Sequence, residues 1–208
     1  MYNGNIKLED ISKRNIRFDD DRFKKASVCI LGAGGIGSNV ANMLVRSCIG
    51  NIRIVDFDIV EPSNLNRQIY SINHIGRYKV EALKEILIGI NPFVNIDIMV
   101  KKVDEDNILD IIGNYDIVVE AFDNAEMKAL AVNTILENLS DKYIVSCSGM
   151  AGLHSSNDIK TKKVMNRLFL CGDYRSDFEE EDCIMAPRVM MVAGHQANVV
   201  LRIVCDLI

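Results

Sequence analysis

Short apolar runs alternate along the chain with stretches in which apolar residues recur at helical spacing. The apolar runs predict strands at residues 27–31, 51–58, 93–100, 115–122 and 142–148. Helical periodicity predicts helices from the first run up to Gly50 and at residues 73–90, 104–113 and 124–139. Strands that alternate with helices in this way are typical of an α/β fold, in which a mostly parallel sheet carries helices on both faces.

After residue 150 the pattern changes. Residues 158–170 predict one or two further strands, antiparallel at the edge of the sheet. Residues 172–182 contain six acidic residues and one arginine with almost no apolar side chains, which predicts a mobile loop. Residues 187–207 predict a last helix, because proline at position 187 is tolerated in a first helical turn.

The length and charge of the chain limit its organisation and its partners. At about 100–200 residues per domain, 208 residues predict one domain, which we place at residues 24–208 after an N-terminal extension at 1–23. A net charge of −5 does not favour a nucleic-acid partner. No apolar run reaches the roughly 20 residues that cross a membrane, so no membrane partner is expected.

The cysteines and the N-terminal residues indicate a compartment. The six cysteines form no CxxC pair, so the sequence lacks the closely spaced ligands of a structural zinc site. Cys29, Cys48, Cys147 and Cys205 fall in apolar elements and are interpreted as reduced core cysteines. Because the N-terminus also lacks the apolar segment of a secretion signal, we expect a cytoplasmic protein.

A glycine-rich turn, "ILGAGGIG", joins the first predicted strand to the first predicted helix. It places Gly32, Gly34, Gly35 and Gly37 where backbone amides at a helix N-terminus approach an anion. In this strand–turn–helix context the turn predicts a nucleotide site. The motif does not by itself separate NAD from ATP.

An acidic residue follows the second predicted strand. Asp56 lies 24 residues after Gly32, where an acid meets ribose hydroxyls in dinucleotide-binding proteins. The alternative is a loop acid that caps a backbone turn. For Asp58, capping and a functional role are both open.

Positive charge downstream of the turn favours ATP over NAD. A triphosphate carries more negative charge than the glycine turn alone neutralises, and Arg67 and Lys79 would supply cations. Ser63, Asn64 and Gln68 would add neutral hydrogen bonds. Each basic residue taken separately has a second interpretation, as a solvated surface charge.

Asp123 directly follows the fourth predicted strand. Open α/β sheets bind ligands at the carboxyl ends of their strands, so this carboxylate would face phosphates unless a cation lies between them. Asp123 is therefore predicted to be a Mg²⁺ ligand. The alternative is an N-cap for the helix that begins near Asn124.

Several segments, in consistent order from about residue 24 to the C-terminus, resemble one known family. "GAGGIGSNVANMLVRSCIGNIRIVDFDIVEPSNLNRQ", "EAFDNAEMKALAVN" and "IMAPRVMMVAGHQAN" are similar to the ThiF/MoeB group of ubiquitin-activating-enzyme-like adenylyltransferases. "SGMAG", "FLCGD" and "MAPRV" look most like the short ThiF form associated with thiamine biosynthesis. The resemblance implies a Rossmann-like, doubly wound fold and a homodimer.

The resemblance also implies a reaction. Such enzymes bind MgATP and the C-terminal Gly-Gly tail of a small ubiquitin-fold sulfur carrier protein, similar to ThiS. The terminal carboxylate attacks the α-phosphate and forms an acyl-adenylate and pyrophosphate, ahead of thiocarboxylate formation. Three alternatives stay open: a MoeB-like or tRNA-modifying relative, an NAD-dependent oxidoreductase, and a non-catalytic protein of the same fold.

The resemblance implies roles for individual residues. It assigns Asp56 to ribose, Arg67 and Lys79 to phosphates, and Asp123 to the metal. An N-terminal arginine often reaches the partner subunit's ATP, and Arg14, or else Arg17, is proposed for that role; the alternative is a solvated arginine. The nucleotide positions of the family fall on Gly34, Gly35, Asp56, Ser63, Asn64, Arg67, Lys79, Asp123 and Asn124.

The chain departs from longer relatives at its cysteines. Those relatives hold structural zinc with two CxxC pairs, whereas Tyr174 stands where the partner of Cys171 belongs and the second pair is missing. We therefore expect no zinc. Cys171 and Cys183 lie outside obvious core elements, so either one is open to a transient sulfur link with the carrier, and the alternative is that both are unreactive.

Overall fold

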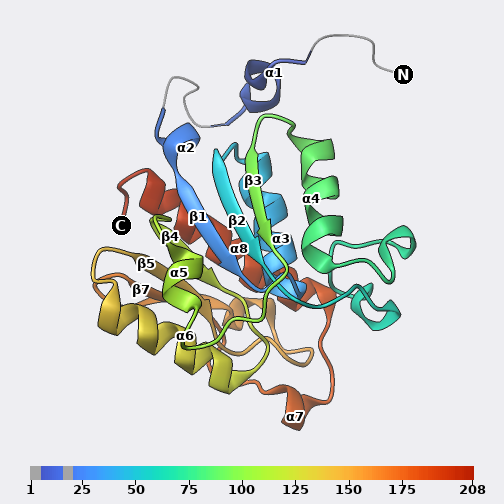
Figure 1. Cartoon of the computed structure of the whole chain (residues 1–208). Helices are drawn as coiled ribbons and strands as arrows, with labels where there is room; N and C mark the ends of the chain where they lie inside the picture. The colour runs from blue at the N-terminus through green and yellow to red at the C-terminus, as the bar shows by residue number, and fades with distance from the viewer. Residues whose placement is uncertain (1–5, 16–20) are drawn as a thin grey trace.

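A computed structural model, which describes residues 6–15 and 21–208, contains one seven-stranded sheet in the order β3-β2-β1-β4-β5-β7-β6 (Figure 1). All neighbouring strands pair in parallel except β6 and β7, which are antiparallel. The strands are β1 (Ser27–Leu31), β2 (Asn51–Val55), β3 (Asn95–Met99), β4 (Ile117–Glu120), β5 (Tyr143–Cys147), β6 (Lys160–Met165) and β7 (Leu168–Gly172).

Helices cover both faces of the sheet (Figure 1). α3 (Gly35–Arg46), α4 (Lys79–Ile90) and α8 (Ala186–Val204) pack on one face, and α5 (Ile108–Ile112) and α6 (Ala125–Asn138) pack on the other. The short elements are α1 (Leu8–Ser12), α2 (Asp21–Lys25), α7 (Phe178–Glu181), η1 (Pro62–Asn64), η2 (Ile72–His74) and η3 (Ser156–Asp158). The doubly wound fold predicted from the alternation is therefore confirmed.

The central strands are mostly apolar at successive positions because both of their faces are buried. Val28 and Ile30 of β1 belong to the core under α3 and α8, whereas Cys29 and Leu31 belong to the core under α5 and α6. A strand buried on both sides needs apolar residues at successive positions, and this explains the continuous run in the sequence.

The antiparallel strands predicted at the edge of the sheet from residues 158–170 are confirmed as β6 and β7. In addition, β7 pairs in parallel with β5, from Ile144↔Leu168 to Cys147↔Cys171. β6 then pairs antiparallel with β7 and forms the edge of the sheet. The hairpin therefore enters the sheet through its second strand, which is the more buried of the two.

Two segments are shaped differently from the sequence prediction. The helix predicted at 73–90 begins at Lys79, after η2 and after Gly76, whose φ of +85° interrupts helical geometry. The segment 172–182, predicted to be a loop without regular structure, contains α7 and a turn at Asp173 whose carboxylate is ion-paired. The acidic residues thus have folded contacts that the composition did not indicate.

The N-terminal residues pack against the domain near the start of β1. The amide of Gly50 donates to the carbonyl of Phe23 at 2.8 Å, and Asn15 donates to the carbonyl of Arg46 at 3.2 Å. The boundary proposed between residues 23 and 24 lies inside α2 and remains a prediction. Among the described helices, none is long and apolar enough to cross a membrane.

Candidate nucleotide site

The glycine turn lies where the carboxyl ends of β1, β2 and β4 meet. Gly32 has a φ of +99°, donates to the carbonyl of Val55 at 2.8 Å, and leaves only 2.8 Å between a built Cβ and the carbonyl oxygen of Ala121. A Cβ at Gly37 would lie 1.9 Å from the carbonyl oxygen of Gly32. Both positions require glycine because the turn is pressed between strand ends and the first turn of α3.

The next two glycines leave the N-terminus of α3 open. Ser38 donates to the carbonyl of Gly34 at 3.0 Å, so the amides before Ser38 have no acceptor inside the helix. A Cβ at Gly35 would lie 3.5 Å from Cγ of Arg67, and one at Gly34 would lie 3.9 Å from Nε2 of Gln68. The structure therefore brings Arg67 and Gln68 to this anion-attracting end of the helix.

Asp56 shapes the turn directly. Its carboxylate accepts from the amide of Ala33 at 2.7 Å and from the amide of Asp58 at 2.8 Å. Burial raises the pKa of Asp56 above its ordinary value, against the opposing effects of these amides and of Lys79. The alternative role predicted for Asp56, capping a backbone turn, is what the geometry shows, and contact with ribose stays a prediction.

Lys79 is nearly buried and forms an ion pair with Asp58. Nζ of Lys79 lies 2.7 Å from Oδ2 of Asp58, and the lysine side chain is 9% exposed against 48% for the aspartate. A buried ammonium group needs a counter-ion. Asp58 supplies one, so a phosphate that approaches Lys79 would share or replace it.

We expect Asp58→Asn to lower the free energy of unfolding of the free protein by about 1 kcal/mol, because it leaves Lys79 with a weaker partner. Saturating MgATP should reduce this loss, since a phosphate then neutralises Lys79. Thermal unfolding with and without MgATP measures both effects. The matched control is Asp97→Asn, which breaks a similarly exposed pair with Arg53 on β2. An equal loss for Asp58→Asn in both conditions would contradict the role of Lys79.

The loop at 61–68 is held by its own polar groups. Nη1 of Arg67 donates to the carbonyl of Ser63 at 3.2 Å and to Oδ1 of Asn66 at 2.8 Å. The amide of Glu61 donates to Oδ1 of Asn64 at 3.0 Å. The predicted hydrogen-bonding side chain of Asn64 thus builds the η1 turn, while the guanidinium of Arg67 is bound to neutral oxygens.

Two residues that sequence reasoning missed connect this loop to the glycine turn. Nδ2 of Asn39 donates to the carbonyls of Gly35 at 2.7 Å and of Arg67 at 3.0 Å. The hydroxyl of Tyr70 donates to the carbonyl of Ala33 at 2.8 Å, and burial raises the pKa of this tyrosine. Their polar side chains among apolar residues were the available signal, but the partners Arg67 and Ala33 are 28 and 37 residues away along the chain.

Asp123 is exposed three residues after the end of β4, next to the segment that packs against Gly32. The amide of Met127 donates to Oδ1 of Asn124 at 3.0 Å, so Asn124 is the N-cap of α6. The alternative interpretation of Asp123 as the N-cap is therefore wrong. Within residues 6–15 and 21–208, no three acidic, histidine or cysteine side chains gather as a metal site, so Asp123 would need ligands from phosphates.

A buried amide oxygen beside the turn fits a bound ligand. Gln68 is 7% exposed, and its Oε1 has no hydrogen-bond partner in the described part of the chain. Buried polar atoms nearly always have a hydrogen-bond partner. A ligand hydroxyl or amino group bound next to the open helix amides would donate the missing hydrogen bond to this oxygen. The residues therefore fit a nucleotide.

Arg14 lies at the opposite end of α3 from the glycine turn. Its neighbour Asn15 contacts Arg46 and Cys48, and the 12 residues of α3 separate that end from Gly35. At 1.5 Å per residue this is roughly 18 Å. Arg14 is exposed, and its role at the nucleotide of a partner subunit stays a prediction, whereas Arg17 lies outside the described residues.

The cysteines are all free in the described structure, and the predictions for three of them are corrected. Cys171 was expected outside the core, but it is fully buried in β7, and burial raises its pKa to about 12. Cys183 is half-buried, and its carbonyl accepts from Gly152 at 2.9 Å. Cys48 and Cys205, expected inside apolar elements, lie just beyond the ends of α3 and α8 and are partly exposed.

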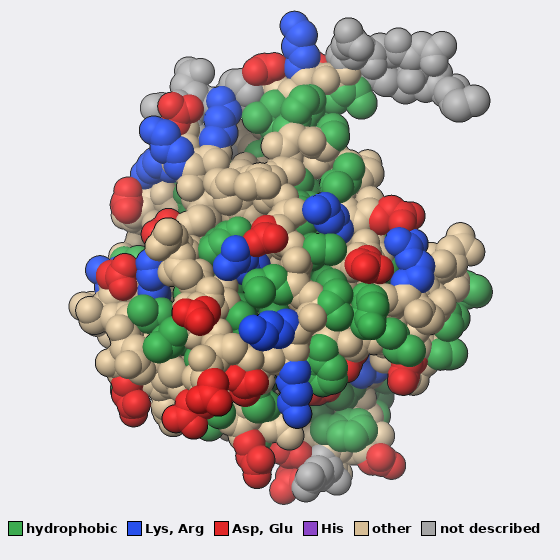
Figure 2. Space-filling model, viewed as in Figure 1, with side chains coloured by type: hydrophobic (Ala, Val, Ile, Leu, Met, Phe, Trp, Pro, Cys, Tyr) green, Lys and Arg blue, Asp and Glu red, His purple; other side chains and the backbone are tan. Residues whose placement is uncertain are grey.

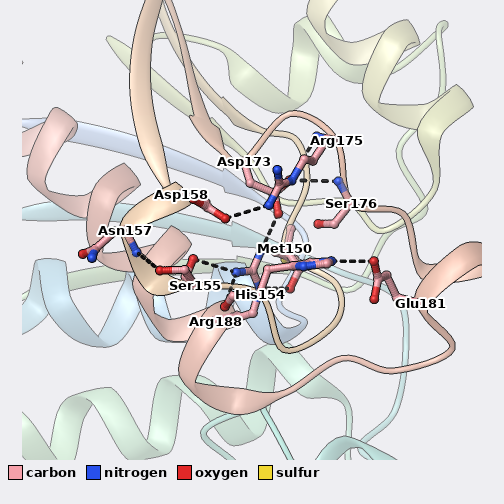
Figure 3. Close-up of polar contacts among 10 residues, drawn as sticks. All are labelled: Met150, His154, Ser155, Asn157, Asp158, Asp173, Arg175, Ser176, Glu181 and Arg188. Atoms are coloured by element: carbon pink, nitrogen blue, oxygen red, sulfur yellow. Dashed lines mark hydrogen bonds and ion pairs between the residues drawn. The ribbon is translucent and has the colours of Figure 1, made fainter.

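A buried ion pair anchors the segment that follows β7 (Figure 3). Asp173 and Arg188 are 1% and 3% exposed and form a direct ion pair. Arg188 also donates to the carbonyl of His154 at 2.8 Å, and Asp173 accepts from the amides of Arg175 at 3.0 Å and Ser176 at 2.9 Å. Three chain segments therefore meet at the start of α8, an arrangement that the sequence analysis did not predict.

A doubly wound sheet with a glycine turn at a helix N-terminus, an acid after the second strand and basic residues beside it defines a nucleotide-binding α/β protein. The chain matches the model of the ThiF family over residues 2–207 and belongs to that family.

Named relatives are similar in sequence to part of this chain. The adenylyltransferase and sulfurtransferase UBA4 of Candida glabrata is 40% identical over 130 residues, which are 62% of this chain and 30% of that protein. The sulfur carrier protein adenylyltransferase of Thermus thermophilus is 38% identical over 105 residues, or 50% of this chain and 39% of that protein. The chain thus spans well under half the length of these two relatives.

A solved structure shares the fold. Escherichia coli tRNA N6-threonylcarbamoyladenosine dehydratase, TcdA, in complex with ATP, has a TM-score of 0.82. It is 20% identical in sequence, and the likeness covers 95% of this chain and 93% of that chain. At this identity the likeness concerns the fold.

Proposed function

We propose that this protein is a MgATP-dependent adenylyltransferase that activates the C-terminal carboxylate of a small ubiquitin-fold sulfur carrier protein. The observation that carries the proposal is the arrangement at one edge of the sheet, where the open N-terminus of α3 lies beside Arg67 and near the Lys79–Asp58 pair. The names of the relatives, adenylyltransferases, and the ATP in the TcdA complex support it.

Each residue has a defined task in this proposal. The amides of Gly34 and Gly35 bind phosphate oxygens, and Arg67 and Lys79 neutralise their charge. Each oxygen of Asp56 that accepts one amide keeps a second lone pair, which is free for a ribose hydroxyl. Asp123 holds Mg²⁺, which when bound supplies further neutralisation of the phosphates.

The proposed reaction brings two anions together. A carboxylate oxygen of the carrier forms a bond to the α-phosphorus while the bond from that phosphorus to the pyrophosphate oxygen breaks. No proton is transferred, so the protein contributes position and positive charge rather than an acid or a base. This is consistent with a site built from cations and backbone amides.

We further propose the kind of carrier, its pathway and the surface that binds it. The motifs that resemble the short ThiF form support a ThiS-like carrier in thiamine biosynthesis, with a homodimer in which Arg14 reaches the partner's ATP. The reduced cysteines support a cytoplasmic location. Acidic side chains gather around α7 at the lower end of the molecule in Figure 2, and Glu180, Asp182 and the apolar Phe178 are exposed there. A carrier with a basic patch would complement this surface.

Pyrophosphate exchange tests the proposal. The protein is incubated with ATP, Mg²⁺, labelled pyrophosphate and carriers that end in Gly-Gly from the thiamine, molybdopterin and tRNA-thiolation pathways. Label should enter ATP only when a matching carrier is present, and a carrier without its last glycine serves as the control. Exchange without any carrier, or binding of NAD in place of ATP, would contradict the proposal.

A further inference from the structure

A buried carboxylate next to the site has no place in the proposed chemistry. Glu120 is the last residue of β4 and is fully buried. Its Oε1 accepts from the amide of Phe122 at 2.7 Å and from Nζ of Lys128 at 3.0 Å. Its Oε2 accepts from Oγ of Ser146 at 2.5 Å and from the same lysine at 3.1 Å. The carboxylate therefore joins β4, β5 and α6.

Such a buried ion pair is a poor way to stabilise a fold. Removing two charges from water is costly, and apolar residues of similar volume in their place are often neutral or stabilising. Around Glu120 the neighbouring positions are apolar, including Val118, Val119 and Ala121. A charged residue here therefore indicates a task that apolar packing would not perform.

That task is visible in the backbone between β4 and α6. The last ladder bond of β4 is from the amide of Ala121 to the carbonyl of Leu31, at 2.9 Å. The next amide, of Phe122, donates to Glu120, and α6 is then capped by Asn124. Asp123 lies between these two side-chain-to-backbone bonds, so its position depends on both of them.

The same segment is pressed against the phosphate turn. A Cβ on Gly32 would lie 2.8 Å from the carbonyl oxygen of Ala121 and 3.5 Å from the nitrogen of Phe122. A rotation of the Phe122 peptide would thus move Asp123 relative to the amides at the start of α3. The hydrogen bond from Phe122 to Glu120 opposes that rotation.

We propose that Glu120 is a positioning residue, whose acceptor oxygen on the amide of Phe122 orients Asp123 toward the metal of MgATP. Lys128 and Ser146 hold the carboxylate in place. The inference rests on the proposed function, because it assumes that Asp123 acts through a metal.

Two double variants of the full chain separate positioning from stability. Glu120→Gln with Lys128→Met removes both charges but keeps an amide oxygen for Phe122. Glu120→Met with Lys128→Met removes both charges and that acceptor. Urea unfolding measures the stability of each double variant. Glu120→Leu with Lys128→Leu replaces the second double variant if that one does not fold.

Calorimetric ATP titrations in Mg²⁺ and in EDTA give the readout, expressed as the factor by which Mg²⁺ tightens ATP binding. The variant with Glu120→Gln and Lys128→Met should keep this factor. In the variant with Glu120→Met and Lys128→Met this factor should be about tenfold smaller, on the scale of one lost contact to a charged group, while the affinity for ATP in EDTA stays unchanged.

Each outcome decides a different claim. If the unsubstituted protein shows no effect of Mg²⁺, the metal role of Asp123 fails, and this inference fails with it. If the unsubstituted protein responds to Mg²⁺ and the two variants respond equally, the inference alone is overturned. A loss of affinity in EDTA as large as in Mg²⁺ would indicate a general structural role and would also overturn it.

Discussion

Arg67→Ala and Asp123→Ala are each expected to reduce carrier-dependent pyrophosphate exchange at least about 10²-fold, the scale of one electrostatic contact in a transition state. Arg67 lies against Gly35 at the open end of α3, and Asp123 lies beyond the end of β4, next to the residues that pack on Gly32. Both side chains are outside the buried core, so the loss should appear without loss of stability. Steady-state exchange at saturating ATP and carrier measures the effect.

Two neighbouring substitutions serve as matched controls. Arg77→Ala removes a cation from the same connection between β2 and α4, where it pairs with Glu85 at 2.8 Å. Glu126→Ala removes an exposed acid from the first turn of α6. Both should leave exchange nearly normal. Near-normal exchange in the Arg67 and Asp123 variants as well would remove the site assignment.

The second large effect concerns stability. We expect Asp173→Asn to lower the free energy of unfolding at pH 7 by about 3–5 kcal/mol, because it leaves the buried guanidinium of Arg188 without its counter-charge. Urea unfolding followed by circular dichroism measures the change. Asp158→Asn is the matched control, since it breaks an exposed ion pair with Arg175 in the same region (Figure 3) and should cost at most about 1 kcal/mol.

The same pair gives the protein a dependence on pH. Burial by itself would raise the pKa of Asp173, but the amides of Ser176 and Arg175 and the charge of Arg188 lower it below its ordinary value. A lowered pKa contributes stability above the unfolded value of about 4, and that stability is lost as the pH falls through the folded value. The Asp173→Asn variant should therefore lose less stability on acidification than the unsubstituted protein. Equal losses would contradict this account.

The sequence by itself determined the class of fold and predicted the location of the candidate site. The alternation of apolar runs with helical periods predicted five parallel strands at nearly their observed positions, because such periods are local and the central strands β1, β4 and β5 are buried on both faces. The spacing from Gly32 to Asp56 correctly placed an acid at the turn, since both residues follow adjacent parallel strands.

Tertiary structure alone decided which polar groups meet. Glu120 accepts a hydrogen bond from Ser146, which is 26 residues away along the chain, and Lys79 pairs with Asp58, which is 21 residues away. It also placed β7 beside β5 and thereby buried Cys171, and it joined Asp173 to Arg188 where composition predicted a mobile loop. Periodicity records which face of an element is apolar, whereas a buried charge is stabilised only by partners that packing brings from other elements.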